Sequence, residues 1–313
     1  MQVIYVNGVE KIDQDKPVSA CIGHFDGVHR GHQALINDTK RISKELNILS
    51  AVITFDPDPS AVLNHQQTKL ITTLNERLAI FKEFEIDIVI VIKFDNEIAN
   101  QEPNEFIIKV LNHLNLRSLT CGFDFTFGYL GKATANTLLN SELIDYPINI
   151  IEEVSYQGRK ISSTWINELL SLGNIKMVNE LLNHPFAIIG KVVKGHQVGK
   201  KLNFPTANIE YISNQSLPKI GVYIGQVKVK DHIYSAMINV GNNPTFYNDH
   251  KITIEAHILN FSEDIYDIDI RIIFLSYLRE EIKFDSADQL VKQLNDDLNS
   301  VKSYFDSHLN NSL

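Results

Sequence analysis

The pattern of apolar residues changes at His184-Pro185, and this change limits the folds open to the chain. Before it, short apolar runs are separated by segments with helical periodicity. The runs are Val18–Ile22, Leu49–Thr54, Ile86–Ile92, Ser118–Gly122 and Ile148–Ile151. After it, runs follow one another with turn residues between them: Phe186–Val193, Gly221–Lys230, Ile233–Val240, Ile252–Leu259 and Ile268–Tyr277. Because the residue before proline avoids helix, we predict two domains, 1–183 and 184–313.

The two patterns predict different folds. Alternation of strands and helices is typical of a Rossmann-like α/β domain, a parallel sheet covered by helices. Consecutive short strands indicate an antiparallel β-barrel. A final apolar stripe predicts a C-terminal helix packed on the barrel; it comprises Leu290, Leu294, Leu298, Val301 and Phe305. Capping boxes are expected at Thr73 with Glu76 and at Ser286 with Gln289.

Charge and composition exclude several classes of protein. The net charge of −9 argues against a general affinity for nucleic acid, although a local positive site could still hold a nucleotide. Cys21 and Cys121 lie in apolar runs, so we expect buried thiols and no disulfide framework. No signal peptide and no run long enough to span a membrane is visible, which predicts a cytoplasmic protein without membrane partners.

The first candidate site follows the first of these apolar runs, in the segment Gly23 to His32. His29 and His32 are three residues apart and can share one face of a helix that begins there. The start of a helix presents free N–H groups to a phosphate, and two imidazoles can add donors. The alternative is a capping turn with two solvated histidines.

The second candidate site lies in the segment Gly195 to Asn208. Gly195 and Gly199 permit tight backbone turns, and Lys200 adds positive charge beside them. Thr206 and Asn208 offer hard oxygen ligands suited to Mg²⁺. A polar hairpin loop is the alternative.

A carboxylate on a later strand is a further candidate. Glu255 alternates with Ile254 and Ala256, so it projects away from the apolar face of its strand. Taken alone, it could be a solvated carboxylate on the outside of a barrel.

These segments resemble known families. The glycine-rich loop with Pro205-Thr206-Ala207-Asn208 is similar to that of riboflavin kinases, and segments 221–223, 239–246 and 278–284 agree in order. Segments 23–32, 54–59, 122–128 and 161–164 resemble bacterial FAD synthetases of the nucleotidylyltransferase superfamily. The whole chain thus resembles bacterial bifunctional riboflavin kinase/FAD synthetases. The resemblance implies phosphorylation of riboflavin to FMN and adenylylation of FMN to FAD, with ATP as co-substrate and Mg²⁺ as cofactor.

The resemblance also implies a role for individual residues. Glu255 would be the general base for riboflavin, Thr206 and Asn208 would hold the metal, and Arg279 would contact the flavin. His29 and His32 would stabilise charge on the α-phosphate of ATP. Residues implied to bind ATP or phosphate in the first domain are Gly23, Phe25, Asp26, Gly31, Asp58, Asp124, Ser162, Ser163 and Thr164. Those implied in the second are Gly195, Gly199, Lys200, Thr206 and Asn208.

Two departures from the family leave alternatives open. The family usually has His at the position of Asp58 and Arg at that of Asn167, so positive charge is lost unless Asp58 holds magnesium. One alternative is therefore a riboflavin kinase with a weakened or inactive adenylyltransferase domain. Another is a flavin-responsive binding or regulatory protein without turnover. The oligomeric state stays open.

Overall fold

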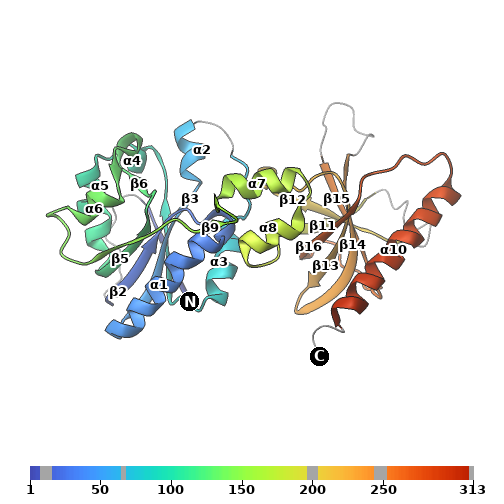
Figure 1. The fold of residues 1–313 in the computed structure, drawn as a ribbon, viewed down its shortest axis with the longest axis horizontal. Coiled ribbons are helices and arrows are strands. Elements are labelled where there is room, and N and C mark those ends of the chain that lie inside the picture. The colour runs from blue at the N-terminus through green and yellow to red at the C-terminus, as the bar shows by residue number, and fades with distance from the viewer. Residues whose placement is uncertain (8–15, 65–67, 196–203, 243–251, 310–313) are drawn as a thin grey trace. The chain divides into compact units, whose positions relative to one another are not determined.

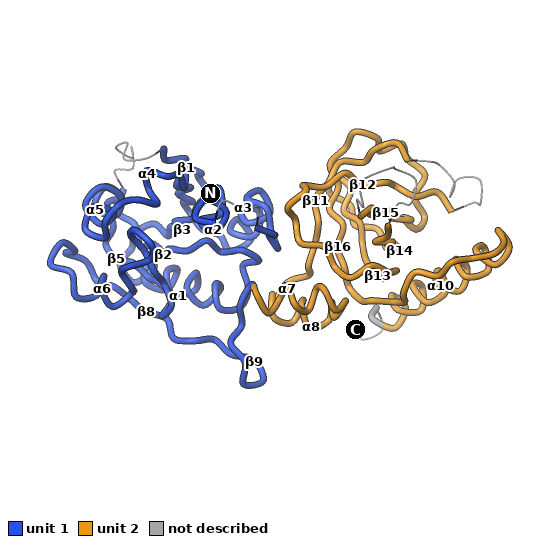
Figure 2. The backbone as a smooth tube through the Cα atoms, turned by 90° about the horizontal axis from the view of Figure 1, so that it is seen from above, with its two compact units in different colours: residues 1–163 blue, residues 164–313 orange. Residues whose placement is uncertain are grey.

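A computed structural model of the chain describes residues 1–7, 16–64, 68–195, 204–242 and 252–309 (Figure 1). The chain forms two compact units, Met1–Ser163 and Thr164–Leu313 (Figure 2). The division lies before His184 because α7 (Ser163–Ser171) and α8 (Ile175–Leu182) join the second unit. The side chain of Asn179 on α8, for example, donates to the carbonyl of Phe274 at 2.9 Å.

The first unit is built on a six-stranded sheet whose paired strands all run parallel. The strand order is β1 (Gln2–Val6), β4 (Ile88–Lys93), β3 (Leu49–Asp56), β2 (Val18–Ile22), β5 (Leu116–Gly122) and β8 (Ile148–Ile151). The five expected strands are all present. The sixth, β1, was not expected and lies at one edge of the sheet.

Helices cover both faces of this sheet, as the alternating pattern predicts (Figure 1). Because successive strand residues point to opposite faces, Ile53 and Val52 enter different cores. The core of Ile53 includes α5 (Pro103–Lys109) and α6 (Ala135–Leu139). The core of Val52 includes α1 (Arg30–Leu46) and α3 (Leu74–Glu83). The expected capping box of Thr73 and Glu76 opens α3.

Shorter elements connect the strands and helices of this unit. They are η1 (Asp26–Val28), α2 (Pro59–Asn64), α4 (Asn96–Ala99), η2 (Leu111–His113), β6 (Thr126–Phe127), η3 (Tyr129–Gly131), β7 (Ala133–Thr134), β9 (Ser155–Tyr156) and β10 (Arg159–Lys160). Two of them, β9 and β10, form an antiparallel hairpin.

The second unit contains a closed antiparallel barrel of six strands. They are, in spatial order, β11 (Ala187–Val193), β12 (Ala207–Tyr211), β15 (Ile252–Ile258), β14 (His232–Asn242), β13 (Gly221–Val229) and β16 (Asp269–Arg279). Five were expected from the sequence. The unexpected strand, β12, begins inside the Pro-Thr-Ala-Asn motif.

The C-terminal helix, α10 (Ala287–Leu309), packs its apolar stripe against the barrel. Val301 is fully buried among Val222, Ile224 and Met237 of β13 and β14. At its start only half of the expected capping box forms. Ser286 accepts from the backbone N–H of Gln289, whereas the Gln289 side chain accepts from Asp285.

The two cysteines are free and buried, as expected. Burial raises the pKa of Cys21 to about 12 and that of Cys121 to about 11, so both are inert thiols at neutral pH. None of the helices in the described part of the chain is both long and apolar enough to cross a membrane.

Candidate active sites

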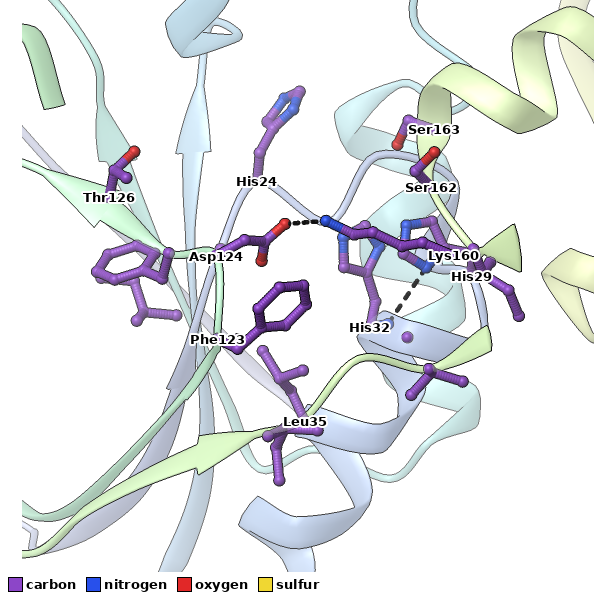
Figure 3. A pocket seen from close by; sticks show the side chains of 18 of the residues that line it. His24, His29, His32, Leu35, Phe123, Asp124, Thr126, Lys160, Ser162 and Ser163 are labelled. Atoms are coloured by element: carbon purple, nitrogen blue, oxygen red, sulfur yellow. Dashed lines mark hydrogen bonds and ion pairs between the residues drawn. The ribbon is translucent and has the colours of Figure 1, made fainter. Parts of the chain in front are cut away.

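A cavity of about 390 Å³ lies in the first unit, beyond the carboxyl ends of the parallel strands (Figure 3). Its lining comes from loops after β2, β3, β5 and β8 and from the start of α7. The expected site residues in this lining are Gly23, His29, Gly31, His32, Asp124, Ser162 and Ser163. Four segments that are far apart in the sequence thus meet at one place. Thr164 is exposed and does not line the cavity.

Phe25 and Asp26 are buried in the loop after β2 and do not line this cavity. Phe25 is fully buried in a left-handed conformation (φ 60°) and packs edge-on against Phe81. The Asp26 carboxylate accepts from the backbone of Thr72 at 2.9 Å and of Ile71 at 3.2 Å. Burial raises the pKa of Asp26 to about 6 despite these bonds. Both residues anchor the loop and neither lines the cavity, and the ATP contacts expected of them stay a prediction.

His29 and His32 lie face to face, with ring centroids 3.7 Å apart. Nδ1 of His29 caps α1 by accepting from the backbone N–H of His32 at 3.3 Å, which assigns the His29 proton to Nε2. Burial lowers the pKa of His29 to about 4 and holds the pKa of His32 well below its usual range. At neutral pH both rings are therefore uncharged hydrogen-bond donors. The sequence alternative of two solvated histidines does not fit this burial.

Two buried ring nitrogens in this cavity have no hydrogen-bond partner among the described residues. They are Nε2 of His24 and Nδ1 of His32. Buried polar atoms are nearly always paired in folded proteins, so orphaned atoms beside a cavity indicate a ligand with polar groups. His24 lies within the predicted segment Gly23 to His32, but it was not identified as a site residue from the sequence.

Asp58 is occupied by contacts within the protein and does not line the cavity. Its carboxylate accepts from the backbone of Ser60 and from the hydroxyl of Thr68, and lies 3.6 Å from Nδ1 of His24. Asp58 thus orients a cavity residue instead of facing the cavity. Asn167, the other departure from the family, accepts from the hydroxyl of Ser216 at 2.6 Å.

Two cations near this cavity were missed by sequence reasoning. Arg77 is 1% exposed and donates to the carbonyl of His24 and to the hydroxyl of Thr54, which holds the loop after β2. Lys160 lines the cavity and forms an ion pair with Asp124 (Figure 3). Each looks in the sequence like an ordinary surface cation, one on a helix and one in a hairpin, so no local signal marks them.

A larger cavity of about 610 Å³ lies in the second unit, between the outer face of the barrel and α10. One part of its wall is apolar, with Val222, Met237, Leu290 and Leu294. The other part is polar and includes Glu255, Thr206 and Asn239. An apolar slot with a few convergent polar groups suits a flat aromatic ligand that carries a polar tail.

Glu255 lies in a row of polar residues that crosses three strands. Asn208 on β12 and Asn239 on β14 stand directly opposite it in the strand ladders. Its neighbours Ile254 and Ala256 are fully buried on the other face, as the alternation predicts. The Thr206 hydroxyl donates to the Glu255 carboxylate at 3.1 Å. Thr206, Asn208 and Glu255 therefore come together as the sequence reading requires.

Gly195 lies against Asn208 of this row. A Cβ at position 195 would lie 2.2 Å from the side-chain nitrogen of Asn208, so a larger residue there would displace that side chain. Gly199 and Lys200 lie outside the described residues. Among the residues that are described, no group of three His, Cys, Asp or Glu side chains could hold a metal. A metal here would depend on the oxygen atoms of Thr206 and Asn208.

Arg279 lines the second cavity, but its guanidinium is already engaged. It binds Asp297 through Nε at 2.9 Å and Nη2 at 2.6 Å, and Nη1 donates to the carbonyl of Glu280. Asp297 is 3% exposed and also accepts from Gln293. This buried pair fixes β16 to α10, and the expected flavin contact of Arg279 stays a prediction.

Family comparisons agree with this division into two sites. The FAD synthetase family matches residues 11–165, and the riboflavin kinase family matches residues 182–305. The boundary predicted at 183/184 lies near the start of the second match. Most of α7, and all of α8 except its last residue Leu182, lie between the two matches. The boundary itself stays a prediction.

Relatives match nearly the full length of the chain. A bifunctional riboflavin kinase/FMN adenylyltransferase from Bacillus subtilis is 33% identical, over 94% of each chain. One of the same name from Escherichia coli K12 is 31% identical, over 96% of this chain and 97% of the relative. A crystal structure from Streptococcus pneumoniae, described as a macrolide-efflux protein, superposes with a TM-score of 0.87 at 30% identity, over 96% of this chain and 99% of its own. The chain belongs to the family of bifunctional riboflavin kinase/FMN adenylyltransferases, with a FAD synthetase domain followed by a riboflavin kinase domain.

Proposed function

We propose that this chain makes FAD from riboflavin in two ATP-dependent steps. The second unit would convert riboflavin and ATP to FMN and ADP, and the first would convert FMN and ATP to FAD and pyrophosphate. The observation that carries the proposal is the hydrogen bond from Thr206 to Glu255 on the polar wall of a cavity whose other wall is apolar. A carboxylate placed there can receive a proton from a bound alcohol.

In the kinase step, Glu255 is the general base. Its carboxylate takes the proton of the terminal ribityl hydroxyl while that oxygen attacks the γ-phosphorus of ATP and the bond to ADP breaks. The hydrogen bond from Thr206 orients the carboxylate, and Asn208 and Asn239 stand opposite Glu255 on the neighbouring strands. The apolar wall of Leu290, Leu294 and Met237 would receive the flavin ring.

Magnesium fits the donors beside Glu255. The hydroxyl of Thr206 and the amide oxygen of Asn208 are hard ligands, which Mg²⁺ prefers. When bound, the metal would supply positive charge that offsets the charge of the triphosphate. Thr206 and Asn208 are the residues that would hold it.

In the adenylyltransferase step, the chemistry requires positioning more than proton transfer. An oxygen of the FMN phosphate attacks the α-phosphorus of ATP, and pyrophosphate leaves. His29 would donate its Nε2 proton to a phosphate oxygen, with His24, Ser162 and Ser163 as further polar contacts in the same cavity. Asp124 and Gly31 also face this space.

Chromatographic analysis of products tests the proposal. The protein is incubated with riboflavin, ATP and Mg²⁺, and we expect FMN to appear first and FAD to follow. Accumulation of FMN without FAD would favour a kinase whose first unit is inactive. Stabilisation by flavin without release of ADP or pyrophosphate would instead favour a flavin-responsive regulatory protein.

A further inference from the structure

The hydroxyl that orients Glu255 belongs to a residue at the very start of a strand. Thr206 donates to the Glu255 carboxylate at 3.1 Å, but the pairing of β12 with β15 begins one residue later, at Ala207. Strand pairing sets the positions of the residues that take part in it. Because Thr206 precedes the first pair, other contacts have to place its hydroxyl.

The contacts of His257 hold the segment at this point. His257 lies two residues after Glu255 on β15, and both side chains line the second cavity. Its Nδ1 lies 2.8 Å from the carbonyl oxygen of Pro205, the residue before Thr206. Its ring also packs against the buried side chain of Phe204, with ring centroids 5.4 Å apart.

The bond to Pro205 assigns a proton to one nitrogen of the His257 ring. A carbonyl oxygen can only accept a hydrogen bond, so Nδ1 of His257 is the donor. In the neutral ring Nε2 then carries no proton. The contact thus depends on one ring atom, and a substitution can keep or remove that atom selectively.

A second bond of the same kind joins the other ends of the two strands. The Tyr211 hydroxyl, on the last residue of β12, donates at 2.7 Å to the carbonyl of Ile252, the first residue of β15. Tyr211 does not line the cavity. The two bonds therefore make similar links between β12 and β15, but only that of His257 lies beside Thr206.

We propose that His257 is a positioning residue of the kinase site. By holding the Pro205 carbonyl through its Nδ1–H, it sets the Thr206 hydroxyl against the Glu255 carboxylate. This rests on the proposed kinase function of the second unit. The proton that leaves riboflavin goes to Glu255, and His257 takes no part in that transfer.

The test measures riboflavin phosphorylation by full-length variants at position 257. In His257→Asn the side-chain amide places a donor where Nδ1 lies, whereas in His257→Gln it lies near the place of Nε2 and misses Pro205. Both variants lack the ring, so the difference between them reports the hydrogen bond. His257→Phe keeps a ring against Phe204 but has no donor. Tyr211→Phe is the matched control, and circular dichroism with FAD formation from added FMN checks that each variant is folded.

We expect His257→Gln to lower kcat for riboflavin phosphorylation roughly fivefold to tenfold, the loss of one neutral hydrogen bond, with little change in the KM for riboflavin. His257→Phe should lose as much, because packing alone does not replace the donor. His257→Asn and Tyr211→Phe should both stay within about twofold of the wild type. A role of His257 in folding alone would instead follow the loss of the ring, and Asn and Gln would then be equally impaired.

A double-mutant cycle tests whether His257 acts through Thr206. Thr206→Val removes the hydroxyl that His257 positions, so His257→Gln should cause little further loss in that background. The role of His257 alone would be overturned by additive losses, by equal losses in Asn and Gln, or by Gln and Phe variants as active as the wild type. Retention of activity in Gln with loss in Asn would also overturn it, since Nε2 would then be the atom that matters. Absence of FMN formation in the wild type would overturn the kinase function with it.

Discussion

At the scale of single residues, the polar row on the barrel wall fixes one carboxylate among neutral neighbours. Asn208 and Asn239 flank Glu255, and Thr206 donates to it. The Thr206 hydrogen bond orients the carboxylate, and within the described part of the chain no salt bridge to Glu255 forms. Such a group can accept a proton because no ion pair has to be broken first.

Replacement of Glu255 by Gln should separate the two activities. The amide keeps the shape of the side chain but cannot take a proton, so riboflavin phosphorylation should fall by about two to four orders of magnitude. Formation of FAD from added FMN should stay at the wild-type rate, since Glu255 does not line the first cavity. Separate assays with riboflavin and with FMN measure the two effects. Equal loss of both activities would indicate unfolding and not loss of a base.

Arg77 has a structural role that no local sequence pattern indicates. Its guanidinium is buried against the carbonyl of His24 and the hydroxyl of Thr54, within the field of Asp26, Asp56 and Asp58. A charge in this position costs desolvation free energy, which its acceptors and the surrounding carboxylates offset.

Arg77→Met should strongly destabilise the first unit. The substitution removes the buried guanidinium and leaves the carboxylates of Asp26, Asp56 and Asp58 without its compensating charge. Breaking a buried charge pair in this way typically lowers the free energy of unfolding by about 3–5 kcal/mol. Urea denaturation measures the free energy of unfolding. Arg41→Met is the control, because Arg41 pairs with Asp38 and Glu45 on the exposed face of α1 and should change stability little. A similar small change for both variants would contradict the structural role of Arg77.

At the scale of elements, the start of α1 couples stability to pH. The folded protein holds His29 and His24 with pKa values of about 4, below the ordinary 6.5. Above pH 6.5 both states are neutral at these sites, so the stability is fully present. As pH falls from 6.5 toward 4, the unfolded chain takes up protons that the folded chain refuses, and stability is lost. Asp26, whose pKa is raised to about 6, opposes this trend below pH 6.

His29→Asn should therefore reduce the acid sensitivity of the first unit. Asparagine is a good N-cap, so α1 keeps its start while one titrating ring is removed. Between pH 7.5 and pH 5 we expect the wild type to lose about 1–2 kcal/mol more unfolding free energy than the variant. Urea midpoints at the two pH values measure this. His113→Gln, at an exposed histidine in η2, should leave the difference unchanged, and parallel curves for wild type and His29→Asn would contradict the prediction.

The elements that the sequence predicts are those with one strong pattern. Buried strands such as Val18–Ile22 appear as short, mostly apolar runs, and β2 begins and ends where the run does. β1 and β12 were missed for a physical reason. β1 is a short apolar run that stays mostly unburied at the edge of the sheet, with Tyr5 63% exposed, and β12 carries the polar residues Asn208 and Glu210. Their strand structure depends on pairing with β4, β11 and β15, which no local pattern reveals.

The site residues were likewise predictable only where a local sequence pattern marks them. Motif residues such as His29, Thr206 and Glu255 could be found because glycine, proline or strict alternation surrounds them. Lys160 and Arg77 could not, since their neighbours in space come from other segments. The roles of Phe25 and Asp26 also required the fold, because burial and the bonds from Thr72 decide that they support the loop.

At the scale of the whole molecule, each described cavity is lined by one unit alone. The first is lined by residues between Ile22 and Ser163, and the second by residues between Phe204 and Asp297. Neither lining borrows a described residue from the other unit. Each reaction should therefore proceed when the other site is disabled, with FMN as the only link between them.

Two full-length variants, each defective in one unit, should consequently complement one another. Glu255→Gln should make no FAD from riboflavin because FMN is missing, and His29→Asn should stop at FMN because a phosphate-binding donor is missing. A mixture of the two should produce FAD after a lag in which FMN accumulates in solution, and the lag should shorten as the protein concentration rises. Timed chromatography of flavins measures this, with added FMN as the control that shortens the lag. Formation of FAD in the mixture without a lag, and without FMN in solution, would contradict transfer through free FMN.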